Sequence, residues 1–169
     1  MKELIVVGSY CDTASKLEAL ESLLLQAQAL GIQTLVIGKY PIPERVQSLC
    51  DYFLFDKDNP FIIGRAISYW HTIHGIRVSD IFPDHGLAAL SQITKSLSVA
   101  KALGYDIAYW VNYDVDLTKF ADFAIAARTS IAQGNHAAGF EFTKRAPHAA
   151  GICLTNIAFK INPASEKLN

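Results

Sequence analysis

Charged residues are scarce in this chain. They make up 18% of its 169 residues, whereas hydrophobic residues make up 51%. The 15 basic and 16 acidic residues nearly cancel, and no basic cluster is larger than the pair Lys144-Arg145. Because binding to nucleic acid depends on a basic surface, nucleic acid is not an expected partner. The chain also lacks low-complexity tracts, so we expect a compact fold in a single domain that spans residues 1–169.

Cysteines and long apolar runs are also few. Cys11, Cys50 and Cys153 are isolated and widely separated, which excludes a disulfide framework and a Cys-x-x-Cys metal site. They are typical of buried thiols in a reducing compartment. No apolar run approaches the ~20 residues of a membrane span, and the run at residues 4–7 is too short for a signal peptide. The sequence therefore predicts a cytoplasmic protein without a transmembrane segment.

The first third of the chain has a strand-helix-strand pattern. The apolar run at residues 4–7 predicts an inner strand. Ser15 and Glu18 have the spacing of a capping box, and the apolar positions that follow at helical spacing end at Gly31. Residues 34–37 and 52–55 predict two more strands, with a short helix between them that ends near residue 49.

The rest of the chain continues this alternation. Residues 61–84 leave two alternatives open, a short hairpin or a surface helix. A long helix is predicted at 86–103, a buried strand at 107–111, a helix from about residue 118, and late strands at 138–142 and 152–161. Alternating strands and helices predict an α/β fold with a mostly parallel central sheet and helices on both faces.

Two carboxylates follow the predicted strand at 107–111. Asp114 and Asp116 stand one residue apart, where open α/β sheets bind their ligands. Mg²⁺ and Mn²⁺ prefer oxygen ligands and commonly bridge protein carboxylates to substrate phosphates, so the pair indicates a phosphate-bearing substrate. Asp-x-Asp after a strand is equally compatible with a polar turn that leads into a helix.

The segment from Asp114 to Thr118 also has the Asp-x-Asp-x-Thr pattern of haloacid-dehalogenase-type phosphatases. In those enzymes the first aspartate is the nucleophile and the second a general acid. Their motif normally lies on the first strand, however, and a later acidic pair binds magnesium. The only acidic residues after Asp122 are Glu141 and Glu166, which are not adjacent.

The order of these pieces resembles the GT-A glycosyltransferases, the nucleotide-sugar-dependent enzymes with a DXD motif. The resemblance covers about residues 3 to 145. It rests on the opening strand and turn through Tyr10, the third strand ending in Asp56-Lys57, the long helix, and the strand that leads to Asp114 and Asp116. It implies a Rossmann-like GT-A fold, a nucleoside diphosphate sugar donor, most simply a UDP-sugar, and Mn²⁺ or Mg²⁺ as cofactor.

The resemblance assigns roles to the acidic pair. It implies that Asp114 and Asp116 bind the cation and, through it, the donor diphosphate. In such enzymes one DXD carboxylate sometimes contacts the donor ribose instead. The segment Asn112-Tyr113-Asp114 also matches the DXD motif, with asparagine in place of the first acid. In that alignment Asp114 is the metal ligand.

The resemblance also assigns donor-binding residues elsewhere in the chain. Gly8, Ser9 and Tyr10 correspond to residues that meet the nucleotide, with Tyr10 stacking on the base or packing over the sheet edge. Asp56 would accept a hydrogen bond from a uracil ring nitrogen and Lys57 would meet phosphate, unless both belong to a solvated turn. Lys95, on the polar face of the long helix, would reach the diphosphate or face solvent.

Acceptor recognition is the least determined part. Glu141 is placed to activate an acceptor hydroxyl, and His136 or His148 to be a third metal ligand. Only about fifty residues follow the acidic pair, fewer than GT-A enzymes use to bind an acceptor. A partner subunit, a small acceptor or water would then complete the reaction, and a homo-oligomer stays open. A non-catalytic nucleotide-binding module is the remaining alternative.

Overall fold

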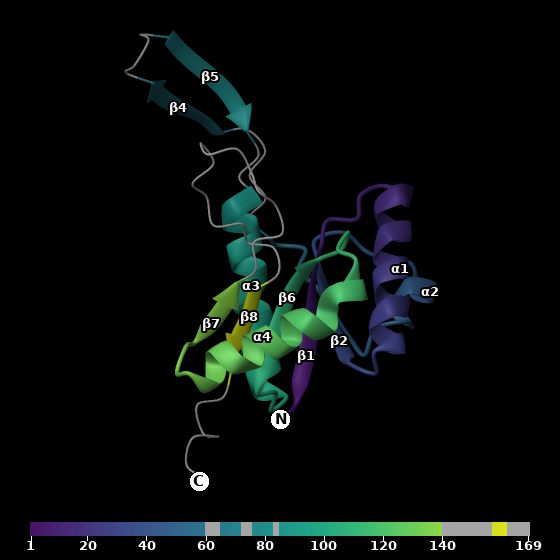
Figure 1. Ribbon diagram of the computed structural model, residues 1–169. Helices are drawn as coiled ribbons and strands as arrows, with labels where there is room; N and C mark the ends of the chain where they lie inside the picture. The colour runs from purple at the N-terminus through teal and green to yellow at the C-terminus, as the bar shows by residue number, and fades with distance from the viewer. Residues whose placement is uncertain (60–64, 72–75, 83–84, 140–156, 162–169) are drawn as a thin grey trace.

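The computed structural model describes residues 1–59, 65–71, 76–82, 85–139 and 157–161. In chain order the elements are β1 (Glu3–Ser9), α1 (Ala14–Ala29), β2 (Gln33–Gly38), α2 (Glu44–Gln47), β3 (Tyr52–Phe55), β4 (Arg65–His71), β5 (Ile76–Phe82), α3 (His85–Ala102), β6 (Ile107–Asn112), the 3₁₀ helix η1 (Leu117–Lys119), α4 (Phe120–Ala132), β7 (Ala137–Gly139) and β8 (Ile157–Lys160). Figure 1 shows their arrangement.

Six strands form one mixed sheet in the order β3-β2-β1-β6-β8-β7. The first four are mutually parallel, and β8 runs antiparallel to both β6 and β7. The predicted α/β class and mostly parallel sheet are confirmed. The late strands were predicted at 138–142 and 152–161, and the structure has strands at 137–139 and 157–160, with residues 140–156 outside the described part.

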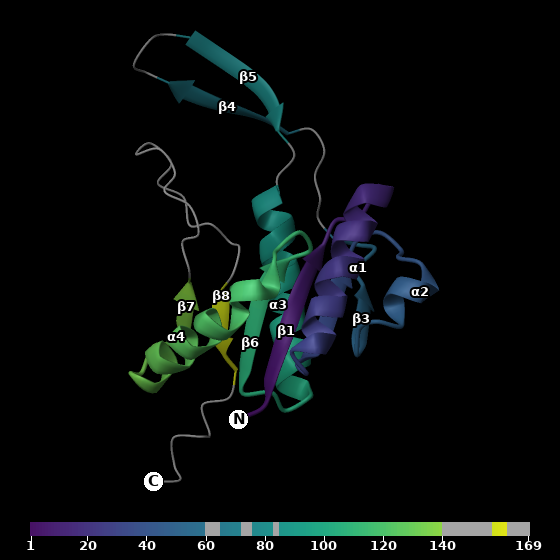
Figure 2. The same ribbon diagram turned by 45° about the vertical axis from the view of Figure 1, so that its right-hand side comes forward.

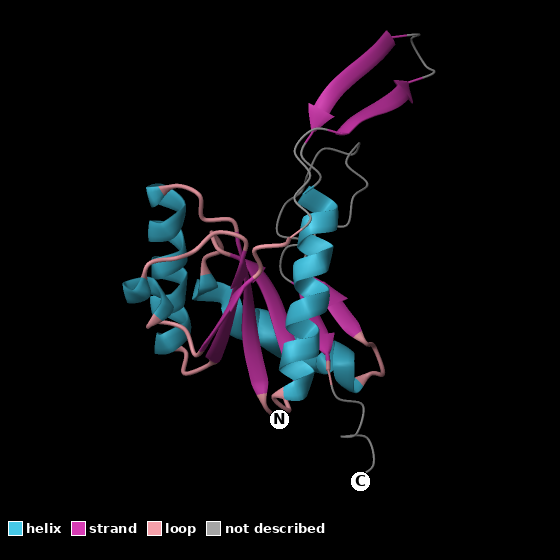
Figure 3. Cartoon of the chain, turned by 180° about the vertical axis from the view of Figure 1, so that it is seen from behind, coloured by secondary structure: helices cyan, strands magenta, loops and turns pink. Residues whose placement is uncertain are grey.

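Helices cover both faces of this sheet, as predicted. Odd-numbered residues of β1, such as Ile5 and Val7, pack in a core with α1 and α4. Even-numbered ones, Leu4 and Val6, pack in a second core with α3. In Figure 3, which views the molecule from the back, α3 lies nearest the viewer and covers one face of the sheet. The helices α1 and α4 cover the opposite face, which Figures 1 and 2 show. Burial on both faces explains why β1 is apolar at consecutive positions rather than at alternate ones.

The stretch at 61–84 contains a hairpin, which resolves one open alternative. β4 and β5 pair antiparallel from Arg65 opposite Phe82 to His71 opposite Ile76. They form a two-stranded sheet of their own, which stands off from the six-stranded sheet in Figures 1 to 3.

The capping box predicted at Ser15 and Glu18 is wrong. The helix begins two residues earlier, with Thr13 as its N-cap and no side-chain capping bond. The carbonyl of Thr13 already accepts the Leu17 amide at 3.1 Å, so Ser15 lies inside the first turn, where it cannot cap. Asp12 instead pairs with Lys16 at 2.5 Å across this helix start.

None of the helices in the described ranges has the length and the apolar character that crossing a bilayer would need.

The ends of α1, α3 and α4 share one stop signal, a glycine in the left-handed region: Gly31, Gly104 and Gly134. At the end of α3, the Gly104 amide donates to the Lys101 carbonyl and the Tyr105 amide to the Ala100 carbonyl, at 3.1 and 3.0 Å. This is the Schellman arrangement, which requires a residue that tolerates positive φ. Gly104 has a φ of 73°.

Replacing Gly104 with alanine should therefore destabilise the fold through backbone strain alone. A Cβ at this position would meet no atom within 4 Å, so no clash contributes. We expect Gly104→Ala to lower the free energy of unfolding by about 1–2 kcal/mol in urea denaturation. Gly139→Ala is the matched control, because a Cβ there also meets open space and its φ is not positive. Equal unfolding free energies for the two variants would contradict this account.

Candidate functional site

The strand registers align the carboxyl ends of the four parallel strands. Ser9 of β1 lies opposite Gly38 of β2, and Gly38 lies opposite Phe55 of β3. On the other side of β1, Gly8 lies opposite Asn112 of β6. The residues that immediately follow these strands therefore emerge next to one another at a single edge of the sheet.

This edge contains the topological switch point of the fold. The chain runs from β1 outward to β2 and β3, then returns through α3 to β6 on the other side of β1. The connection after β1 leads toward β2, and the connection after β6 leads away from β1. The two connections therefore diverge at the carboxyl ends of β1 and β6, where open α/β sheets bind ligands.

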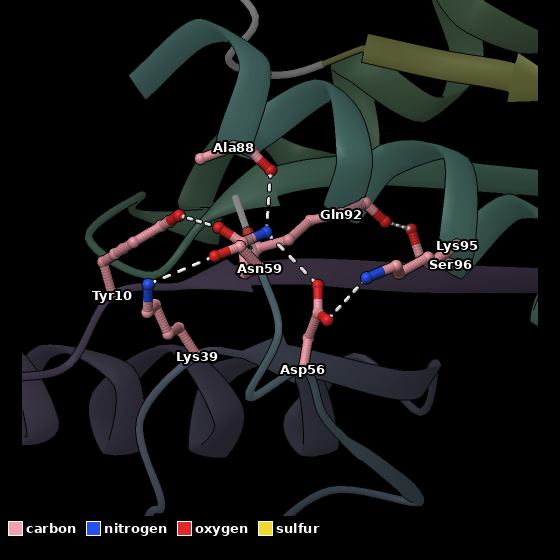
Figure 4. Close-up of polar contacts among 8 residues, drawn as sticks. All are labelled: Tyr10, Lys39, Asp56, Asn59, Ala88, Gln92, Lys95 and Ser96. Carbon is pink, nitrogen blue, oxygen red and sulfur yellow. Dashed lines mark hydrogen bonds and ion pairs between the residues drawn. The ribbon is translucent and has the colours of Figure 1, made fainter. Parts of the chain in front are cut away.

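Tyr10, Lys39 and Asp56, the first residues after β1, β2 and β3, meet around a single side chain, Asn59 (Figure 4). Asn59 is 3% exposed. The Tyr10 hydroxyl donates to its Oδ1, and its Nδ2 donates to Asp56 Oδ2 at 3.2 Å. Lys39 Nζ donates to its backbone carbonyl at 3.1 Å. A loop asparagine thus organises groups from three strands.

The helix α3 closes the other side of this network. Lys95 Nζ lies 2.6 Å from Asp56 Oδ1, and Asn59 Nδ2 also donates to the Ala88 carbonyl at 3.0 Å. The Asp56 side chain is 5% exposed, whereas that of Lys95 is 43% exposed. Both carboxylate oxygens of Asp56 therefore have protein partners, as a buried charge requires.

Burial and charge also act on Tyr10. Desolvation, followed by the nearby charge of Asp56 and the neighbouring Tyr40, raises the pKa of Tyr10 to about 12. The phenol therefore stays protonated at neutral pH and is available as a hydrogen-bond donor. Its ring meets that of Tyr40 edge-on, with centroids 6.4 Å apart.

Two buried donors near this network have no hydrogen-bond partner in the described part of the chain. They are Gln92 Nε2 on α3 and Trp110 Nε1 on β6, whose side chains are 1% and 2% exposed. The Gln92 side chain extends toward Asn59 in Figure 4. An unpaired buried donor costs about 1–3 kcal/mol, so native structures seldom retain one.

Gly8 and Ser9 have structural roles at this edge. A Cβ on Gly8 would lie 2.4 Å from the Trp110 ring, so the indole packs directly against the glycine backbone. Ser9 is 1% exposed, and its hydroxyl donates to Cys11 Sγ at 3.2 Å. Both residues shape the end of β1.

Asp114 and Asp116 follow β6 at the same edge and are exposed. Asp116 is the N-cap of η1, where its Oδ1 accepts the Thr118 amide at 2.9 Å. One oxygen of Asp116 therefore has the role expected of a polar turn that leads into a helix. Asp114 lies near enough to Cys11 and Tyr113 for its charge to contribute to the raised pKa of each, although burial is the larger cause in both.

A cation at the acidic pair would have to take most of its ligands from phosphate and water. Among the described residues, no three histidine, cysteine or acidic side chains gather into a metal site. Mg²⁺ and Mn²⁺ commonly bind proteins through one or two carboxylates, with phosphate oxygens and water completing the shell. Asp114 and the second oxygen of Asp116 are suitable donors for that arrangement.

The remaining candidates lie elsewhere. Lys57 is exposed beside the network, and Glu141 and His148 lie outside the described residues. His136 is excluded as a third ligand, because its carbonyl bonds the Lys160 amide and Lys160 pairs with Ile107, the first residue of β6. At ~3.3 Å per residue, His136 lies roughly 20 Å along the strand from Asp114.

An open hollow of about 270 Å³ lies at the opposite, amino-terminal edge of the sheet, between the end of α1 and the starts of β2 and β3. Its polar groups are already engaged. Asp51 Oδ2 accepts the Thr34 amide at 2.8 Å, and Gln28 donates to the Leu49 carbonyl at 3.2 Å. Burial raises the pKa of the Cys50 thiol there, which disfavours the nucleophilic thiolate. The hollow is therefore a weaker candidate than the carboxyl edge.

Lys39, Asn59 and Gln92 are site residues that the sequence analysis missed. Lys39 had a usable signal, since it directly follows a predicted strand, as Tyr10 and Asp56 do. Asn59 lies in the polar stretch that follows the third predicted strand, and nothing in the sequence indicates that its amide turns inward. Gln92 lies on the helix face that packs on the sheet, which only the structure identifies.

Comparison with known proteins adds no assignment. No protein-family model matches the chain, and no curated protein or solved structure matches it significantly.

The Asp56–Lys95 ion pair should contribute measurably to stability. Lys95→Met removes the cation and leaves a buried carboxylate with one partner fewer. We expect a loss of about 1–2 kcal/mol in the free energy of unfolding, less than for a fully buried pair because Lys95 is partly solvated. Lys101→Met, an exposed lysine on the same helix, should change it by less than about 0.5 kcal/mol. Similar losses for both variants would show that the ion pair contributes nothing.

Proposed function

We propose that this chain is a GT-A-type glycosyltransferase domain that binds a nucleoside diphosphate sugar, most simply a UDP-sugar, with Mn²⁺ or Mg²⁺. The observation that carries the proposal is that two sets of groups follow strands that end at the same sheet edge. Tyr10, Asp56 and Lys95 lie on one side of the switch point, and Asp114 and Asp116 on the other. All five had been assigned to donor binding from the sequence.

The two sets have complementary chemistry for such a donor. The network offers a phenol donor and a carboxylate acceptor, which suit the polar edge of a nucleobase. The partly exposed Lys95 and the exposed Lys57 provide positive charge for phosphate. The acidic pair provides the oxygen ligands that a phosphate-bound divalent cation prefers.

In this proposal the chain's residues bind and orient the donor. Tyr10 and Asp56 would hold the base, while Asp114 and Asp116 would hold the cation and, through it, the diphosphate. When bound, the cation would stabilise the negative charge that develops on the leaving nucleoside diphosphate. Glu141 stays the proposed base that activates the acceptor hydroxyl, and the identity of the acceptor stays open among a small molecule, a group bound by a second subunit, and water.

The acidic pair provides the direct test. We expect UDP binding, measured by isothermal titration calorimetry, to require Mn²⁺ and to be lost with EDTA. The double variant Asp114→Asn, Asp116→Asn should bind at least about tenfold more weakly with Mn²⁺, equivalent to ~1.4 kcal/mol. Of the single variants, Asp114→Asn should have the larger effect, because one oxygen of Asp116 is already used in capping η1.

Asp122→Asn is the matched control, since Asp122 is an exposed acid in the first turn of α4. It should bind UDP like the unmodified protein. Unchanged Mn²⁺-dependent binding in the double variant would refute the assignment of the acidic pair. Release of phosphate from p-nitrophenyl phosphate, abolished by Asp114→Asn, would favour the phosphatase alternative, and UDP binding without turnover of any UDP-sugar would favour a non-catalytic module.

A further inference from the structure

The Asn59 amide has the same hydrogen-bonding pattern as part of a nucleobase. Its carbonyl oxygen accepts from Tyr10, and its adjacent N–H donates to Asp56 at 3.2 Å. An acceptor next to a donor, C=O beside N–H, is also what the imide edge of uracil presents. Tyr10 and Asp56 are the residues proposed above to hold the base, so the amide and the base would compete for the same two partners.

We propose that the Asn59 amide occupies the base-binding position in the free protein, and that a uracil nucleotide binds by displacing this amide from Tyr10 and Asp56. The inference rests on the proposed function and adds that, without ligand, the protein's own side chain fills the base-binding position. The amide keeps the buried Asp56 carboxylate hydrogen-bonded while no ligand is present, which avoids the cost of an unsatisfied buried charge.

The backbone around Asn59 is held in a way that lets the side chain leave alone. Lys39 donates to the Asn59 carbonyl at 3.1 Å, and the Asn59 amide N–H donates to the Asp56 carbonyl at 3.1 Å. With the main chain bonded at both groups, the motion that the proposal requires is rotation about the Asn59 side-chain bonds. The Ala88 carbonyl, which Asn59 also bonds at 3.0 Å, lies in α3 and keeps its helical partner.

Gln92 gives a reason to expect uracil rather than another base in that place. The imide edge of uracil is a carbonyl, an N–H and a second carbonyl, whereas the Asn59 amide has only the first two of these groups. Among the residues that the structure describes, Gln92 Nε2 is a buried donor with no hydrogen-bond partner, on a side chain that extends toward Asn59. The second carbonyl of uracil would supply the acceptor that Gln92 lacks. Cytosine has no N–H at its ring nitrogen to offer Asp56.

The test compares UDP and CDP binding, with Mn²⁺ present, in the unmodified protein and in Asn59→Ala. Removing the amide removes the competitor, so we expect Asn59→Ala to bind UDP about fivefold more tightly, equivalent to ~1 kcal/mol. CDP binding should not gain. Asn135→Ala, an exposed asparagine after α4, is the control and should leave both affinities unchanged. If Asn59 instead supports the site, Asn59→Ala will bind UDP as weakly as the unmodified protein or more weakly, and the inference fails.

A second measurement does not depend on how well Asn59→Ala folds. In the unmodified protein, the side-chain NH₂ resonances of Asn59, assigned by triple-resonance NMR on that protein, should move toward solvent-exposed values as UDP saturates the site. Unchanged resonances at saturation would overturn the inference while leaving the proposed function intact. Failure of both the unmodified protein and Asn59→Ala to bind UDP would instead refute the proposed function, and the inference with it.

Discussion

The pairing of β1 on both of its edges is the constraint on which the rest of the structure depends. β1 bonds β2 on one side and β6 on the other, and its side chains enter the core of each face in turn. A strand in that position cannot shift by one residue without exchanging its two faces. Its register therefore fixes which residues emerge at the carboxyl edge, and the network around Asn59 and the acidic pair both inherit their positions from it.

The second constraint is the buried carboxylate of Asp56. A charge at 5% exposure is stable only if its oxygens are bonded, and here a lysine from α3 and an amide from the following turn bond them. These two partners tie α3 to the ends of β2 and β3 on the face where Trp110 packs against Gly8. The electrostatics of one side chain thus help to join the helix to the sheet at the edge where ligand binding is proposed.

Much of the fold could be predicted from periodicity because its strands are buried on both faces and therefore form continuous apolar runs. Residues 4–7, 34–37 and 107–111 are examples, and all lie in strands. The start of α1 was mispredicted because Ser15 and Glu18 have the right spacing for a capping box, while the earlier Thr13 carbonyl begins the helix. The direction in which a side chain points was harder to predict from the sequence. Tyr10 and Asp56 could be assigned to the edge by their positions after predicted strands. The inward direction of the Asn59 side chain, and the absence of a partner for Gln92 Nε2 within the described ranges, depend on packing between distant segments.

The network also limits how a ligand can gain affinity. A base bound as proposed would exchange one amide's hydrogen bonds for its own, so Tyr10 and Asp56 would be bonded before and after binding. Such an exchange contributes little net free energy, because the net value of a hydrogen bond depends on what it replaces. A wrong base, however, would leave a buried donor or acceptor unpaired, which costs far more than a correct base gains. In the proposed donor complex, affinity would therefore come mainly from the diphosphate, the cation and Asp114, while the network around Asn59 would provide the discrimination between bases.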